Sequence, residues 1–419
     1  MAKNLKNKTV LVVDYGNYIG FAIALAKTFG TVYYFTPWQT SYPKWNQYAI
    51  GIGVEEIERI DEPWSRWDEY DLIAFPDLFQ GDFADWCVKQ GKVVFGAKQG
   101  EEIEIYRNSF KELLKDFKLD VNKYEEIEGM TALREYLEGK EDKYIKTNLI
   151  RGSLETFHYK DDKLSASRLK QLHHELGAYA EHAIFIVEDP IPDAVEIGYD
   201  GWTIDGKYPE VCLTGVETKD CGYCGGIIDY DKLPDSLQKI NKKFAKVFAE
   251  SQYRCNFSNE VRITKDGKAY FIDPTCRIPQ PPGDLMQILF TNFGEMVWDI
   301  ANGIVPTPEY KHKFGAQLII KSSWAEQEPQ AVYFDEKYKD FVHIKNLMVT
   351  DGNRYYIPII EMQEIGAITG YGDTIEEAID MVKKIAETVK GDCIELNPDG
   401  MMASLDQIEK LKEYGIKLF

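Results

Sequence analysis

The chain has 419 residues, of which 44% are hydrophobic and 28% charged, and its formal net charge is -20. This length predicts two or three compact domains, and the composition is that of a globular protein rather than a collagen-like, coiled-coil or disordered one. The negative charge argues against nucleic acid and anionic membranes as partners.

The N-terminal sequence runs from a polar basic tip directly into a strand pattern, without the apolar region of a signal peptide. No apolar run reaches the length of a transmembrane helix. The seven cysteines are scattered and odd in number, which does not suggest a disulfide framework. We therefore expect a cytoplasmic protein with reduced cysteines.

The first 100 residues alternate between strand and helix patterns. A tight turn at Gly16 and a helical pattern ending at Gly30 separate the first two strands. This order predicts an open parallel α/β unit. Gly16 and Gly20 do not make the GxGxxG pattern, so a dinucleotide site is not favoured. The predicted strands cover 8–14, 31–36, 71–77 and 92–97.

Beyond residue 100 the periodicity changes several times. Helical patterns dominate first, a strand-rich region follows, and a last region alternates strands with one strong helix, which is typical of a small α+β cap. Individual helices are predicted near 165–177, 235–251, 285–303 and 374–391. The expected domains are 1–100, 101–312 and 313–419.

A hairpin carries the strongest functional signal. Asp266 and Gly267 lie between two strand-like runs and predict a type I′ turn. With these two as turn residues, Glu260 lies opposite Asp273 on the same face. Facing carboxylates repel each other unless something neutralises them. Three interpretations stay open: an ion pair with Arg262, a hard cation such as magnesium, or solvated surface carboxylates.

This hairpin resembles that of the ATP-grasp superfamily, in which facing acidic residues hold the magnesium ions of ATP. The resemblance implies that Glu260, Asp273 and Thr275 are the metal ligands, with Thr275 where the family usually has Asn. It also implies that Arg277 holds the acyl phosphate or the substrate carboxylate as a catalytic residue.

The layout of the whole chain is similar to that of the phosphoribosylamine–glycine ligase family. The resemblance implies a mixed α/β and α+β fold. It would have a Rossmann-like pre-ATP-grasp domain, an ATP-grasp centre of two subdomains and a small carboxy-terminal α+β cap.

Further residues are assigned by the same resemblance. The strand pattern at 143–150 resembles the strand with the phosphate-binding lysine, which implies this catalytic and nucleotide-binding role for Lys146. A solvated lysine on an amphipathic strand is the alternative. The stretch after it has only Gly152 where the family has a glycine-rich flap, and it implies phosphate contacts from Arg151 and Ser153.

Residues 184–201 resemble the strand pair that binds adenine and ribose. The match implies that the backbone of Val187 reads adenine, that Glu188 opens the hinge, and that Glu196 accepts the ribose hydroxyls; a charged strand end is the alternative for both glutamates.

A helical pattern over 107–115 resembles the family's helix with a nucleotide-contacting lysine. Arg107 stands at the place of that lysine, and Lys111 follows one turn later. The pattern by itself favours an ordinary solvated helix face.

The resemblance implies an ADP-forming carboxylate–amine ligase that uses ATP and Mg²⁺ and forms an acyl phosphate. Its partners would be a small-molecule carboxylate and an amine, and a homodimer is an open alternative to a monomer. Two other functions stay open: a degenerate ATP-grasp protein that binds nucleotide without ligating, and a nicotinamide-dependent oxidoreductase. Cys221 and Cys224 form a single CxxC, which is weak evidence for zinc.

Overall fold

The computed structural model describes residues 3–38, 41–42, 44–149, 155–358 and 363–419. The predicted fold class is confirmed, because a parallel sheet and several antiparallel sheets are combined with helices. Contacts divide the chain into two compact units, each made of separate stretches. The first contains Met1–Glu101, Glu196–Glu260 and Thr275–Phe419, and the second contains Glu102–Val195 and Val261–Pro274. The three-domain division stays a prediction.

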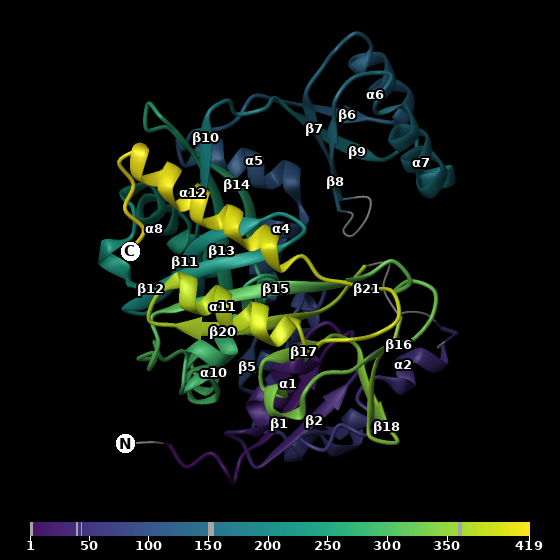
Figure 1. The fold of residues 1–419 in the computed structure, drawn as a ribbon, viewed down its shortest axis with the longest axis vertical. Helices are drawn as coiled ribbons and strands as arrows, with labels where there is room; N and C mark the ends of the chain where they lie inside the picture. The colour runs from purple at the N-terminus through teal and green to yellow at the C-terminus, as the bar shows by residue number, and fades with distance from the viewer. Residues whose placement is uncertain (1–2, 39–40, 43, 150–154, 359–362) are drawn as a thin grey trace. The chain divides into compact units, whose positions relative to one another are not determined.

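The first unit begins with a five-stranded parallel sheet in the order β3-β2-β1-β4-β5, of which Figure 1 labels β1, β2 and β5. Its central strands are continuous apolar runs because both faces of a parallel sheet are buried. Val10, for example, is fully buried and pairs with Val32 on one side and Leu72 on the other. The predicted strands are confirmed as β1 (Thr9–Val13), β2 (Thr31–Phe35), β4 (Leu72–Ala74) and β5 (Val94–Phe95), and the short β3 is Glu58–Arg59.

The connection between β1 and helix α1 (Ile19–Ala26) is fixed by a buried carboxylate. Asp14 accepts hydrogen bonds from the backbone N–H of Tyr18 and from the hydroxyl of Tyr34. Gly16 follows with a φ of +112°, and a Cβ there would meet the side chain of Asn346. This turn therefore requires glycine both for its backbone angle and for the close approach.

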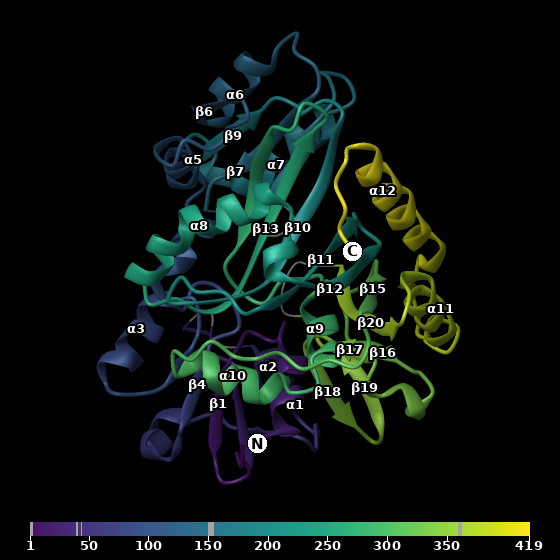
Figure 2. The same cartoon turned by 90° about the vertical axis from the view of Figure 1, so that its left-hand side faces the viewer.

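A larger antiparallel sheet forms the centre of the first unit. Helix α11 packs on β20 and β15, and α12 contacts β11, so these helices lie along the sheet (Figure 2). This antiparallel sheet contains β10 (Ala194–Ile204), β11 (Val211–Thr218), β12 (Gly222–Asp229), β15 (Phe314–Ser322), β20 (Glu364–Gly372), β17 (Val342–Ile344) and β21 (Ile394–Glu395). The helices are α8 (Asp235–Glu250), α11 (Ile375–Ala386) and α12 (Met402–Glu413).

The single helix expected over 285–303 is wrong. The structure has two helices, α9 (Gly283–Leu289) and α10 (Phe293–Ala301). Phe290 ends the first in an extended conformation and forms a β-bridge with Tyr310, so local pairing interrupts a segment whose apolar periodicity continues.

A small three-stranded sheet attaches to the parallel sheet region. The backbone N–H of Gly51 donates to the carbonyl of Leu347, and that of Val349 donates to Ile52. These contacts hold β18 beside the segment that precedes β3. The sheet consists of β16 (Gln330–Val332), β19 (Asn353–Tyr356) and β18 (Leu347–Thr350).

The second unit is built on a four-stranded antiparallel sheet in the order β6-β9-β7-β8 (Figure 1). Helices α6 (Met130–Leu137) and α7 (Ala166–Leu176) bury their leucines against one face of it. The strands are β6 (Tyr124–Glu128), β9 (Ile184–Glu188), β7 (Lys143–Thr147) and β8 (Thr156–Tyr159). Helix α5 (Arg107–Asp116) and the tip of the hairpin between β13 (Arg254–Thr264) and β14 (Ala269–Thr275) complete the unit.

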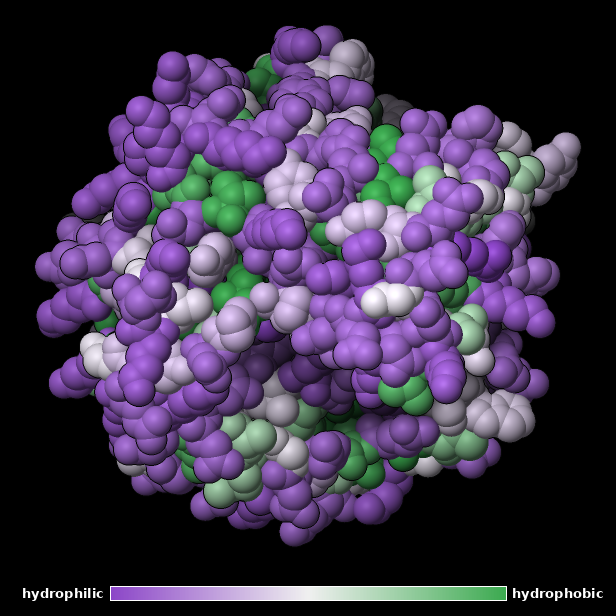
Figure 3. Space-filling view, turned by 90° about the horizontal axis from the view of Figure 1, so that it is seen from above, coloured by the Kyte–Doolittle hydropathy of each residue, from purple (hydrophilic) through white to green (hydrophobic). Residues whose placement is uncertain are grey.

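The face of the molecule drawn in Figure 3 is mostly hydrophilic, with hydrophobic residues scattered among hydrophilic ones. This agrees with the net charge of -20. Within the ranges that the structure describes, no helix is long and apolar enough to cross a membrane.

Each unit contains a hydrophobic cluster of its own, which includes Ile145 in the second unit and Ile73 in the first, and this predicts local effects of core substitutions. Ile145 on β7 is fully buried, so Ile145→Ala should lower the stability of the second unit by about 2–5 kcal/mol. Hydrogen exchange should then rise in β6–β9 while β1–β5 stay protected. The matched variant Ile73→Ala, in the parallel sheet, should give the reverse pattern. Equal loss of protection in both sheets would show that the units unfold as one.

Candidate functional site

Four charged side chains meet inside the second unit. Lys146 Nζ lies 2.7 Å from Asp273 Oδ2 and 3.4 Å from Glu188 Oε2. Lys111 Nζ forms an ion pair with the other oxygen of Glu188. The side chains of Lys111, Lys146 and Glu188 are only 3–5% exposed, so these charges interact in a largely water-free environment. We refer to Lys111, Lys146, Glu188 and Asp273 as the charged cluster.

The register of two strands explains why Lys146 and Glu188 are neighbours. Lys146 pairs with Ile186 and Tyr144 pairs with Glu188, so the two charged residues are diagonal on one face of the β7–β9 ladder. Ile145 and Val187 point to the opposite face and belong to the hydrophobic core. The alternation of each strand thus separates a core face from a charged face.

Helix α5 and the hairpin supply the other two members of the cluster. Phe271 packs edge-on against Phe110 of α5, with ring centroids 5.0 Å apart. Residues two apart on a strand share a face, so the side that anchors Phe271 also carries Asp273. A β-bridge between Asp120 and Tyr270 holds the same strand to the segment after α5.

The pKa directions follow from this geometry. Burial acts to raise the pKa of Glu188, but Lys146 and Lys111 outweigh it and hold the pKa below its usual range. Burial also lowers the pKa of Lys111, against the opposing effect of Glu188. The pKa of Asp273 is lowered too, because Lys146 and Arg107 outweigh its partial burial.

Arg107 and Lys111 contradict the solvated helix face that the sequence pattern favoured. Both side chains are buried on the same face of α5, four residues apart. Arg107 donates to the carbonyl of Thr147 at 2.6 Å and pairs with Glu155, while its own backbone N–H donates to Asn148. Arg107 therefore connects α5 to the end of β7.

Lys111 is the member of the cluster that the sequence interpretation did not include among the site residues. The spacing of four residues from Arg107 was the available signal, because it places both side chains on one helix face. The alternative of a solvated strand lysine for Lys146 is also wrong, since its side chain is 5% exposed.

The hairpin turn differs from the predicted type I′ turn. The N–H of Gly267 donates to the carbonyl of Thr264 at 2.8 Å, and that of Thr264 donates to Lys268 at 3.0 Å. Gly267 has a φ of +83°, whereas Asp266 is not among the residues with positive φ. A type I turn followed by a glycine bulge therefore replaces type I′.

This turn pairs Thr264 with Lys268, one residue away from the predicted register. The predicted facing of Glu260 and Asp273 rested on that register, so the turn gives it no support. Glu260 belongs to the first unit and Asp273 to the second, and their approach stays a prediction.

Val187 lies in a central strand of its sheet. It pairs with Glu125 on one side and Ile145 on the other, so its main chain is within the ladder. The chain leaves the strand after Glu188, where an open cavity of about 410 Å³ is lined by residues 190–193 and the hairpin turn. The reading of adenine by the backbone of Val187 stays a prediction.

The remaining predicted residues are distributed as follows. Glu196 lies on β10 and Thr275 ends β14, both half-buried and both in the first unit, and their roles stay predictions. Arg151 and Ser153 lie outside the described residues. Arg277 donates to the hydroxyl of Tyr18 at 3.0 Å, at the carboxyl end of the parallel sheet.

The structure gives the CxxC pair no further metal ligand among the described residues. Cys221 and Cys224 are buried, and the Cys221 thiol donates to the carbonyl of Asn397. Burial raises the pKa of Cys224 to about 12, which disfavours the thiolate that a metal binds. Among the described residues, no group of three His, Cys, Asp or Glu side chains could hold a metal ion by itself.

Comparisons with known proteins define the fold. No family model and no curated protein sequence matches the chain. The structure, however, superposes on phosphoribosylamine–glycine ligase from Thermotoga maritima with a TM-score of 0.69, over 93% of this chain and 99% of that one, at 14% identity. The chain has the ATP-grasp fold.

Other ATP-grasp enzymes match over similar lengths. Biotin carboxylase from Campylobacter jejuni, in a βγ-ATP complex, gives a TM-score of 0.63 at 12% identity, over 97% of this chain and 96% of that one. A second match is the biotin carboxylase domain dimer of 2-oxoglutarate carboxylase from Hydrogenobacter thermophilus, with MgADP, ADP and bicarbonate. Its TM-score is 0.64 at 12% identity, over 98% of this chain and 99% of that one. These identities establish the ATP-grasp fold alone.

The charged cluster predicts a pH-dependent stability. Glu188→Gln removes a buried charge that two lysines compensate, so it should cost about 3–5 kcal/mol at pH 7. Because the folded pKa of Glu188 lies below its unfolded value, this contribution is present above about pH 5 and is lost as the pH falls further. Denaturant unfolding of the parent and of Glu188→Gln should therefore show a difference in the free energy of unfolding that becomes smaller from pH 5 to pH 3. The exposed control Glu141→Gln should match the parent throughout, and a pH-independent difference for Glu188→Gln would contradict the prediction.

Proposed function

We propose that this protein is an ADP-forming ATP-grasp ligase that activates a small carboxylate with ATP and joins it to an amine. The observation that carries the proposal is the charged cluster, in which two buried lysines and two carboxylates from separate elements surround one point of the second unit. Buried lysines are rare and costly without a ligand or partner charge to justify them. The ATP-grasp fold supports a nucleotide at this position.

In this proposal the lysines provide positive charge for phosphate oxygens. Lys146 and Lys111 would each act as a point charge on the phosphate chain, and Arg107 adds a third cation whose field already reaches Asp273. The buried setting strengthens these interactions because water does not screen them. Glu188 would keep both ammonium groups in place through its ion pairs.

The reaction would proceed in two steps. The substrate carboxylate attacks the γ-phosphorus of ATP, releasing ADP and forming an acyl phosphate, and an amine then displaces inorganic phosphate from the acyl carbon. Arg277 is a planar cation with the geometry to hold a carboxylate or acyl phosphate. No enzyme nucleophile is required, so positioning and charge neutralisation supply the catalysis.

Asp273 fits the one-carboxylate pattern of a magnesium site. Magnesium usually keeps several waters and binds one or two carboxylates together with substrate phosphates, so a complete protein cage is not needed. The side chain of Asp273 is 40% exposed and contacts Lys146 through Oδ2. Asp273 would hold the ion, with Glu260 and Thr275 as further proposed ligands. The bound ion would neutralise charge on the phosphate oxygens.

A degenerate ATP-grasp protein is the second candidate. Thr275 stands where a better magnesium ligand is usual in the family, and Arg107 is used to connect α5 with β7. Such a protein would bind ATP without releasing ADP. The ATP-grasp fold gives no support to the nicotinamide-dependent alternative, which rested on the parallel sheet alone.

Lys146→Met tests the nucleotide site. Loss of one charge-assisted contact costs about 1.5–3 kcal/mol, so ATP should bind roughly 10- to 100-fold more weakly in calorimetry with magnesium present. Lys115→Met is the matched control, because Lys115 lies on α5 but is exposed. The parent should bind ATP and not NAD. Unchanged ATP affinity in Lys146→Met would show that ATP does not bind at the charged cluster.

Asp273→Asn separates a ligase from a degenerate binder. The substitution keeps the shape and removes the charge, so ADP release with panels of acids and amines should fall by at least about 100-fold. The loss should affect turnover more than ATP binding, because the carboxylate acts mainly in the transition state. Asp266→Asn at the exposed turn is the control. If the parent binds ATP and releases no ADP with any mixture, the protein is the degenerate binder.

A further inference from the structure

The first unit contains a cavity of about 390 Å³ that is separate in chain and composition from the charged cluster. All its lining residues belong to the first unit, from α1, the segment before β3, α9 and the segments around β17, β18 and β19. Cavities of this volume accommodate small organic molecules. None of the residues assigned to nucleotide, metal or acyl phosphate lines it.

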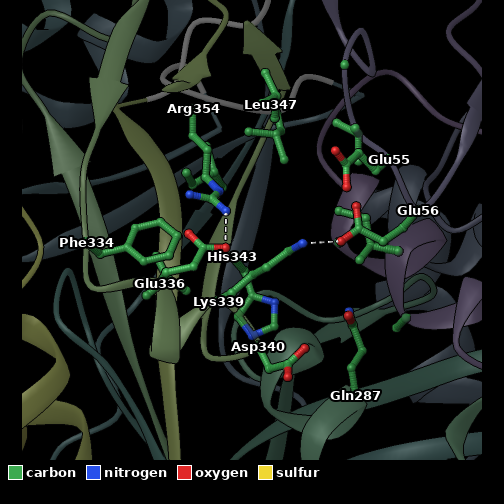
Figure 4. Close-up of a pocket in the computed structure, with 18 of the residues that line it drawn as sticks. Glu55, Glu56, Gln287, Phe334, Glu336, Lys339, Asp340, His343, Leu347 and Arg354 are labelled. Carbon is green, nitrogen blue, oxygen red and sulfur yellow. Dashed lines mark hydrogen bonds and ion pairs between the residues drawn. The ribbon is translucent and has the colours of Figure 1, made fainter. Parts of the chain in front are cut away.

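The walls of this cavity are mostly apolar. Ile23 and Ala24 of α1 form one side, and Leu347 and Val349 of β18 form another, with Phe334 beside them. Figure 4 shows Phe334 and Leu347 bordering the space, with charged side chains between them. An apolar wall with a few polar groups is typical of a pocket that orients a small organic ligand.

Three ion pairs line the cavity. Lys339 Nζ lies 2.6 Å from Glu56, Arg354 lies 2.9 Å from Glu336, and Lys27 lies 2.9 Å from Asp340. In Figure 4, Arg354 and Glu336 lie on one side, while Lys339 extends across to Glu56 on the other. Each lining cation therefore has a carboxylate partner.

One lining carboxylate remains. Glu55 is exposed beside Glu56 and, among the described residues, makes no ion pair. His343 adds no compensating charge, because burial lowers its pKa below the usual value. The lining thus holds four carboxylates against three cations, an excess of one negative charge. A bound anion would face this excess, whereas a cation would neutralise it.

We propose that this cavity binds a small primary amine with an aliphatic body, whose ammonium group contacts Glu55 while its hydrocarbon part contacts the α1 and β18 walls. An ammonium that donates to the Glu55 carboxylate forms a charge-assisted hydrogen bond, which is stronger than a neutral one. The site is independent of the proposed ligase activity, because no nucleotide is needed to form it.

Calorimetry on the full chain with 3-methylbutylamine and 3-methylbutanoate tests the charge preference, because the two probes share a hydrocarbon part and differ in sign of charge. The amine should bind at least about tenfold more tightly than the carboxylate, which corresponds to one favourable ionic contact. Equal affinities, or no detectable binding of the amine at millimolar concentration, would overturn the proposal.

Two variants locate the binding. Glu55→Gln should weaken the amine about tenfold and remove the preference over the carboxylate, while Glu58→Gln, an exposed carboxylate outside the lining, should change neither. Ala24→Leu extends the α1 wall into the cavity and should abolish binding of the amine. Amine binding that survives both Glu55→Gln and Ala24→Leu, or that is weakened equally by Glu58→Gln, would place it on the general negative surface and refute the site.

Discussion

The ion pairs of Glu188 with Lys111 and Lys146 are the contacts on which the charged face of the second unit depends. Ammonium and carboxylate groups removed from water are costly unless each has an opposite charge beside it. Here Glu188 forms ion pairs with both Lys111 and Lys146, and Asp273 forms a second ion pair with Lys146. This balance ties helix α5, strands β7 and β9 and the hairpin strand to a common point. The hydrophobic core on the other face of β7 and β9 then fixes the strands that present these charges.

Local patterns were sufficient for much of the fold. The continuous apolar run at 8–14 became β1, and the amphipathic pattern at 374–391 became α11, because burial on two faces or one leaves a clear period in the sequence. The helix expected over 285–303 failed because its apolar periodicity continues through Phe290, where tertiary pairing with Tyr310 ends the helix. Periodicity records which residues are buried and carries little information about which backbone groups pair.

Less of the candidate site than of the fold could be predicted from the sequence. Lys146 and Glu188 could be assigned by resemblance, yet the burial of Lys111 depends on a carboxylate from a distant strand that no local pattern reveals. The hairpin turn illustrates a different limit. An Asp-Gly pair is compatible with more than one turn, and the bulged type I turn pairs Thr264 with Lys268, one residue away from the register of a type I′ turn. A prediction of which side chains face each other across a hairpin is therefore correct only if the turn type is predicted correctly.

The second unit is assembled from two stretches of chain with residues 196–260 between them. The longer stretch contains both lysines and Glu188, and Asp273 belongs to the later one. During synthesis the chain emerges from the ribosome in order, so the lysines are made and can be buried before their second carboxylate exists. The emerging site then carries two positive charges against one negative charge. Arrival of the hairpin completes the neutralisation, which makes the docking of Asp273 a natural last step in the assembly of the second unit, before residues 275–419 of the first unit are made.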